Sequence, residues 1–161
     1  MAELALMFAD RAQHLDELII PALHRGTWVL CDRFTDSSEA YQGGGRELGS
    51  ALVMELHRLL CRDLRPDLTI LMVSDPAASV ARARRRNVQQ VLVNQADENR
   101  FEQENRAFYK RVHEAYLAIA DREPGRMVKV DAREPVATVH KKIVQIVDEK
   151  LGLLRQGKSM G

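Results

Sequence analysis

The sequence predicts an α/β fold in which a parallel sheet is covered by helices. Three short apolar runs, at 27–32, 68–73 and 127–131, have the composition of buried strands. Longer stretches with apolar residues at helical spacing flank and separate them. Because strands that alternate with helices form βαβ units, the pattern favours a parallel sheet with about three visible strands.

Length and composition indicate an ordinary globular domain. The chain has 161 residues, of which 45% are hydrophobic and 29% charged, and its net charge is +1. This balance implies no bulk attraction to nucleic acid or to a membrane surface. No apolar run is long enough to cross a bilayer, and the first residues lack the basic region of a secretory signal. Cys31 and Cys61 have no metal-site spacing. We therefore expect a cytoplasmic protein with free thiols.

The first half of the chain divides into four segments. A helix is expected over 3–24, where apolar residues recur at helical spacing. The strand at 27–32 follows, and then a polar loop that extends to Arg46. The next helix ends near Leu60, and Ser50 is its candidate N-cap.

The second half alternates in the same way and contains no internal repeat. The elements expected here are, in chain order, a strand at 68–73, a helix from Asp75 to the basic run at 82–86, a long helix at 99–120, a strand at 127–131, a last helix at 136–151 and a flexible tail at 152–161.

An acid and an arginine stand directly after the first expected strand. Ligands of open α/β sheets bind outside the carboxyl ends of the strands. Arg33 offers a planar fork of donors that suits a phosphate, and Asp32 is suited to a hydrated Mg²⁺. The simpler alternative is an ion pair at the end of a strand.

The polar loop adds hydroxyl, amide and aromatic groups next to this pair. Ser38, Tyr41 and Gln42 are its candidate ligand-binding residues, and three glycines at 43–45 follow them. The alternatives are that Tyr41 is a packing residue and that the glycines form a plain flexible loop.

Seven segments, taken in their order and spacing, resemble thymidylate kinases of the bacterial type. These segments are Leu6–His14, Ile20–Leu23, Asp32–Phe34, Ala40–Arg46, Leu64–Thr69, Arg100–Glu104 and Val130–Ala132. The resemblance covers most of the chain and implies a P-loop NTPase-like domain over 1–151. It also implies a nucleoside monophosphate kinase that transfers the γ-phosphoryl group of ATP to dTMP, giving dTDP, with Mg²⁺.

The resemblance also implies roles for single residues. Phe8 would stack on thymine, Arg11 would bind the edge of the base, and Arg33 would clamp the dTMP phosphate as a catalytic residue. Asp32 would lie near the metal, through water. The residues implied to hold base and sugar are Ser38, Tyr41 and Gln42. Without the resemblance, Phe8 is more often a core residue and Arg11 is usually a solvated helix charge.

The chain departs from the family pattern at its beginning. The family starts with a strand and a GxxxxGK[ST] loop that cradles the phosphates of ATP, and no counterpart stands ahead of the helix at 3–24. We therefore expect the first βαβ portion to be absent from this chain. Residues 152–159 fit the motif letter for letter, but they follow a helix rather than a strand, so we expect no nucleotide there.

A second departure concerns the lid, at 82–102. Arg84 and Arg85 are the candidate catalytic arginines that would stabilise charge between the phosphates. The segment from Asn87 to Glu98 is longer than in the family. The alternative interpretation of the basic run is a solvated helix face.

The resemblance implies a dTMP kinase that forms a homodimer through helices including 3–24. One alternative is a non-catalytic dTMP-binding or dimerising subunit, or a pseudo-kinase fragment. Another is a nucleic-acid-binding module that uses the basic run at 82–86, which the near-neutral charge and the lack of interleaved aromatic residues disfavour.

Overall fold

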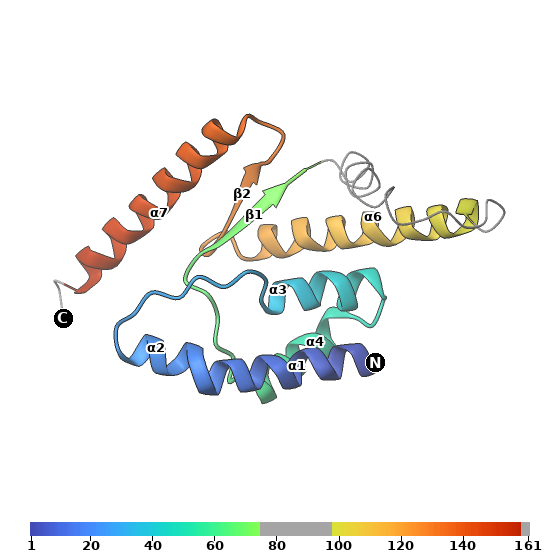
Figure 1. The fold of residues 1–161 in the computed structure, drawn as a ribbon, viewed down its shortest axis with the longest axis horizontal. Helices are drawn as coiled ribbons and strands as arrows, with labels where there is room; N and C mark the ends of the chain where they lie inside the picture. Colours follow the sequence, from blue (N-terminus) through green and yellow to red (C-terminus); the bar gives the residue numbers. More distant parts are fainter. Residues whose placement is uncertain (75–97, 159–161) are drawn as a thin grey trace. The chain divides into compact units, whose positions relative to one another are not determined.

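The computed structural model of the chain describes residues 1–74 and 98–158 (Figure 1). The described residues form two units, each with its own contacts. The first contains residues 1–65 and 98–119, and the second contains residues 66–74 and 120–158.

The first unit begins with one uninterrupted helical stretch. It consists of α1 (Ala2–His14), the π-helical turn η1 (Leu15–Ile19) and α2 (Ile20–His24). The π-helical turn lies directly ahead of Pro21, which has no N–H group for the carbonyl four residues before it. The helix predicted at 3–24 is confirmed.

One face of this stretch forms the core of the first unit. The residues buried on this face recur at helical spacing and form one cluster with two buried residues from α4 and the turn after it. The cluster consists of Leu4, Phe8, Leu15, Ile19, Val53 and Cys61. Because Phe8 belongs to this cluster, its ring is fixed by packing, and the residues one turn further along α1 are positioned with it.

The strand predicted at 27–32 is wrong. These residues form no regular element, Trp28 is 67% exposed, and Leu30 is fully exposed. The two strands of the described sheet pair with one another, and neither pairs with this segment. Without a neighbour to bond its backbone, an apolar run does not become a strand.

The loop predicted to extend to Arg46 is helical for most of its length. The helix α3 (Thr35–Ser38) continues into the π-helical η2 (Glu39–Gly45), which packs against α4 (Ser50–Leu60) (Figure 1). The predicted N-cap is wrong by one residue, because Gly49 holds that position with φ of 86°. The hydroxyl of Ser50 instead donates to the carboxylate of Glu39.

The second unit contains the sheet. Strands β1 (Thr69–Val73) and β2 (Met127–Asp131) pair in parallel, with Thr69 opposite Met127. The helix α7 (Val136–Lys158) packs on β2, and α6 (Glu98–Arg122) leads from the first unit into the second. The α/β class and the parallel pairing are confirmed, with two of the three expected strands. The tail predicted from Gly152 is helical as far as Lys158.

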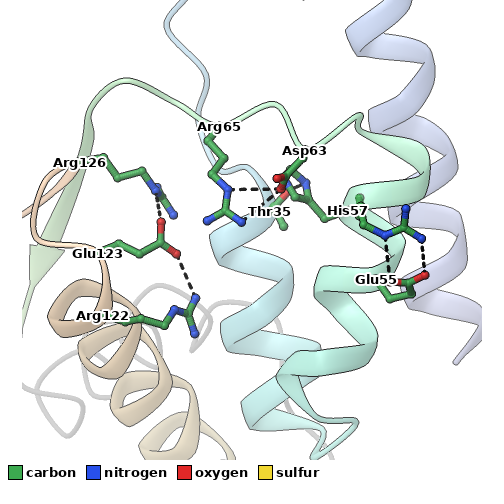
Figure 2. Close-up of polar contacts among 9 residues, drawn as sticks. Thr35, Glu55, His57, Asp63, Arg65, Arg122, Glu123 and Arg126 are labelled. Carbon is green, nitrogen blue, oxygen red and sulfur yellow. Dashed lines mark hydrogen bonds and ion pairs between the residues drawn. The ribbon is translucent and has the colours of Figure 1, made fainter.

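A polar cluster ties the turn before β2 to the start of β1. The Glu123 carboxylate accepts hydrogen bonds from Arg122, at 3.1 Å, and from Arg126 (Figure 2). The Arg126 guanidinium also donates to the Thr69 hydroxyl at 3.0 Å. The backbone N–H of Thr69 donates to the carbonyl of Arg126 at 2.7 Å. These bonds fix the register at which the two strands begin.

Several predictions lie outside the described residues. They are the helix from Asp75, the basic run at 82–86, the lid arginines Arg84 and Arg85, and most of the 87–98 segment. Within 1–74 and 98–158, no helix is long and apolar enough to cross a membrane.

Candidate functional site

Phe8 and Arg11, the residues predicted to bind the base, lie on α1, and the Arg11 side chain reaches Ser38 of α3. Three residues separate Phe8 from Arg11, which places both on one face of the helix. The Arg11 guanidinium carbon is 4.7 Å from the centre of the Phe8 ring and 5.4 Å from the centre of the Phe34 ring. The cation is therefore held next to two aromatic rings, and the Phe8 side chain is fully buried.

Arg11 is only partly satisfied by hydrogen bonds. Its Nη2 donates to the Ser38 hydroxyl at 2.9 Å, whereas its Nη1 is buried without a hydrogen-bond partner in the described part of the chain. Burial lowers the pKa of Arg11, an effect opposed by the nearby Cys61, Cys31 and Asp10. A desolvated cation with a spare N–H group is suited to an acceptor on a ligand.

Gln42 presents the complementary group. Its Nε2 donates to the Glu3 carboxylate at 2.7 Å, and its Oε1 is buried with no hydrogen-bond partner among residues 1–74 and 98–158. A buried carbonyl without a donor is costly. The first unit thus contains one unsatisfied donor, on Arg11, and one unsatisfied acceptor, on Gln42.

Arg33 has an unusual backbone conformation. Its φ is 67°, in the left-handed region that residues other than glycine rarely adopt. Its side chain is exposed, and the guanidinium carbon lies 5.2 Å from the centre of the Tyr41 ring. Backbone strain of this kind concentrates at functional positions, which supports the prediction that Arg33 serves the site.

Tyr41 is held by aromatic neighbours from α6. The rings of Phe108 and Tyr116 meet it edge to face, with centroids 6.1 and 6.3 Å away. The Tyr116 hydroxyl donates to the Ser37 hydroxyl at 2.8 Å, and burial raises the pKa of Tyr116. The sequence does not single out Tyr116 as a site residue. The only sequence feature that points to Tyr116 is its hydroxyl group, which it carries on the apolar face of the helix predicted at 99–120.

Two of the three glycines, Gly44 and Gly45, serve packing rather than flexibility. A Cβ atom at Gly44 would lie 2.6 Å from Cβ of Ala115, and one at Gly45 would lie 2.5 Å from Cε2 of Phe108. Arg111 donates both Nε and Nη2 to the Gly45 carbonyl, at 3.1 and 2.9 Å. The flexible-loop interpretation is therefore wrong, because these glycines let η2 approach α6 closely.

The structure gives Asp32 no partner ligands for a metal. Its side chain is exposed, and the part of the chain that the structure describes contains no group of three or more His, Cys, Asp or Glu residues suited to a metal ion. A single carboxylate fits a Mg²⁺ ion that keeps most of its water and is held by substrate phosphates. It does not fit an ion held by protein groups alone.

Most of the GxxxxGKS motif, at 152–158, is helical rather than a loop. Residues 152–158 continue α7. Their N–H groups point along a helix and bond its carbonyls, so they do not converge on a ligand. That this segment binds no nucleotide stays a prediction, and Ser159 lies outside the described residues.

Comparisons with known proteins identify relatives over nearly the whole chain. A family profile described as thymidylate kinase matches residues 1–143. The curated thymidylate kinase of Alcanivorax borkumensis is 48% identical over 147 residues, which cover 91% of this chain and 66% of that protein. That of Methylococcus capsulatus is 45% identical over 150 residues, covering 93% and 68%.

A solved structure is also similar. The crystal structure of thymidylate kinase from Ehrlichia chaffeensis matches with a TM-score of 0.65 and 25% identity, covering 91% of this chain and 64% of that one. The chain thus spans about two thirds of the length of the relatives it matches.

Proposed function

Because this chain belongs to the thymidylate kinase family, we propose that it provides the dTMP site of an enzyme that transfers the γ-phosphoryl group of ATP to dTMP. The observation that carries the proposal is the pair of buried polar atoms without hydrogen-bond partners, on Arg11 and Gln42, together with the buried Phe8 ring next to Arg11. The fold similarity to a solved thymidylate kinase supports it.

The edge of a thymine base matches these two atoms in hydrogen-bonding type. Its O4 carbonyl accepts a hydrogen bond and its N3–H donates one, so the proposal pairs O4 with Arg11 and N3–H with Gln42. Ser38 acts through Arg11, whose guanidinium it orients. Because Arg11 covers the buried Phe8 ring, stacking of the base on Phe8 requires the guanidinium to move.

The proposal gives Arg33 the phosphate of dTMP. Its planar guanidinium binds two phosphate oxygens. The Arg33 side chain is exposed, so it is accessible to the ligand. Tyr41, which lies beneath Arg33 and is held by Tyr116, stands next to the sugar and disfavours a 2′-hydroxyl. Clamping the acceptor phosphate near the donor is the main requirement of phosphoryl transfer.

ATP and Mg²⁺ complete the proposal as co-substrate and metal. When bound, the ion neutralises charge on the phosphates, and Asp32 would hold it through water. Arg84 and Arg85 are proposed to stabilise charge in transit, as lid residues. The segment at 152–158 does not fit ATP, since it is helical.

A homodimer and a cytoplasmic location also belong to the proposal. Leu6, Leu18 and Leu23 are large apolar side chains exposed on the stretch from α1 to α2, as a helix-to-helix interface requires. The free cysteines, Cys31 and Cys61, agree with a reducing compartment.

The test is ADP formation by the purified chain with ATP, Mg²⁺ and dTMP, against a blank without dTMP. Arg33→Ala should lower dTMP-dependent turnover about a hundredfold, because it removes the phosphate clamp. Arg25→Ala, an exposed arginine at the end of α2, is the matched control and should change nothing. Binding of dTMP without turnover would favour the non-catalytic alternative, and absence of both would reject the proposal.

A further inference from the structure

A buried histidine, which the proposed reaction does not use, connects α4 to the start of α3. His57 lies in the last turn of α4 and is 1% exposed. Its Nδ1 is 2.9 Å from the Thr35 hydroxyl oxygen, and its Nε2 is 3.5 Å from Oδ1 of Asp63 (Figure 2). Thr35 is the first residue of α3 and follows Arg33 and Phe34 directly.

The partners of His57 fix its tautomer. A carboxylate only accepts hydrogen bonds, so Asp63 favours the proton on Nε2. The Nδ1 atom then carries a lone pair and accepts the Thr35 hydroxyl proton. The imidazole thereby links three elements: the Thr35 hydroxyl of α3 donates to Nδ1, and Nε2–H of this α4 residue points to Asp63 in the turn after α4.

The turn that presents Asp63 is itself unusual. Arg62 and Asp63 both have φ of 54°, two successive left-handed residues without glycine. Arg65 donates Nε and Nη2 to Oδ1 of Asp63, at 3.3 and 3.2 Å (Figure 2). The contacts with His57 and Arg65 account for a backbone conformation that would otherwise be unfavourable.

Burial, more than the neighbouring charges, sets the direction in which the pKa of His57 shifts. Desolvation by burial lowers its pKa, and so do the nearby cations Arg65 and Arg11, whereas Asp63 and Asp36 raise it. These groups belong to the turn after α4, to α1 and to α3, and burial prevails.

His57 also touches the site that holds Arg11. Its ring meets the Phe34 ring edge to face, with centroids 6.1 Å apart, and Phe34 lies 5.4 Å from the Arg11 guanidinium. We propose that His57 is a positioning residue: it holds Thr35 and Phe34 in place, and through Phe34 it sets the position of Arg11 for the substrate base. This rests on the proposed function, because Arg11 is the assumed ligand of the base.

Calorimetric titration of the full chain with dTMP tests the proposal. His57→Leu and Thr35→Val each remove the hydrogen bond and should weaken binding about fivefold, and the double variant should be no weaker than either. His57→Asn places a carbonyl oxygen near the former Nδ1, so it should restore affinity. His140→Leu, at an exposed histidine of α7, is the matched control. Wild-type affinity in His57→Leu, or no rescue by asparagine, would overturn the proposal.

A second measurement needs no ligand. Nitrogen NMR of the imidazole should show the proton on Nε2, and the Nε–H signal of Arg11 should shift in His57→Leu and return in His57→Asn. A proton on Nδ1, or an Arg11 signal that His57→Leu leaves unmoved, would overturn the positioning role. If the wild-type chain binds no dTMP, the proposed function fails, and the Arg11 signal still decides the role of His57.

Discussion

The guanidinium of Arg11 covers the ring of Phe8, with 4.7 Å between its central carbon and the ring centre. The resemblance assigns these residues separate contacts with thymine, yet in the structure they contact each other. The cation–π contact compensates part of the cost of burying Arg11. It also means that a base and the guanidinium compete for the same ring.

Replacing Arg11 with lysine should weaken dTMP binding about tenfold, because an ammonium group cannot bond Ser38 and the base at fixed planar angles. The melting temperature should change little, since the stem and the charge remain. Calorimetric titration and thermal unfolding would measure the two quantities, with Arg25→Lys as the control. An unchanged affinity would show that Arg11 does not bind the base.

Adding one methyl group at Gly45 should destabilise the first unit by about 2 kcal/mol, because Cβ would overlap Phe108 and Val112. Gly44→Ala should behave in the same way against Ala115. Gly125→Ala is the matched control, since no atom lies within 4 Å of its Cβ position and its φ is not positive. Urea unfolding of the three variants measures the effect. Equal stability in all three would mean that η2 does not approach α6 this closely.

Arg33 offers a comparison between stability and binding. Glycine at this position relieves the left-handed φ of 67°, whereas alanine keeps a Cβ atom and the strain. Arg33→Gly should therefore be about 1 kcal/mol more stable than Arg33→Ala, although both lose the phosphate clamp. Urea unfolding and dTMP titration of the pair would measure this. Equal stability would indicate that the residue relaxes out of the left-handed region in solution.

The sequence predicts helices, which depend on local periodicity, better than features that depend on contacts with distant residues. The helical spacing of apolar residues over 3–24 predicts the first helix, because amphipathic periodicity is a local property. It does not separate the buried Leu4 and Phe8 from the exposed Leu18. Apolar composition also suggested a strand at 27–32, but a strand depends on a pairing partner, which local composition does not reveal.

The candidate site shows the same division. The sequence pointed to Arg33 because a guanidinium after an expected strand suits a phosphate, and to Arg11 only through the family resemblance. The roles of both residues stay predictions. The sequence indicated only a loop for the glycines at 43–45, because Gly44 and Gly45 approach Ala115 and Phe108 of α6, which lie far away in the sequence. The contacts of Tyr116 and His57 also join residues far apart in sequence, so no spacing rule predicts them.

The buried His57 should make the stability of the first unit depend on pH. Its pKa in the folded chain lies below its ordinary value of 6.5. Between these two values the unfolded chain binds a proton that the folded chain does not, so the free energy of unfolding falls as the pH drops below 6.5. The slope from this one group is at most about 1.4 kcal/mol per pH unit, and above 6.5 it vanishes.

Urea unfolding of wild type and His57→Asn between about pH 5 and pH 8 isolates the effect, because the variant lacks the titrating group. If both chains lose stability in parallel on acidification, His57 is not the group responsible, and its imidazole is accessible to protons in the folded state.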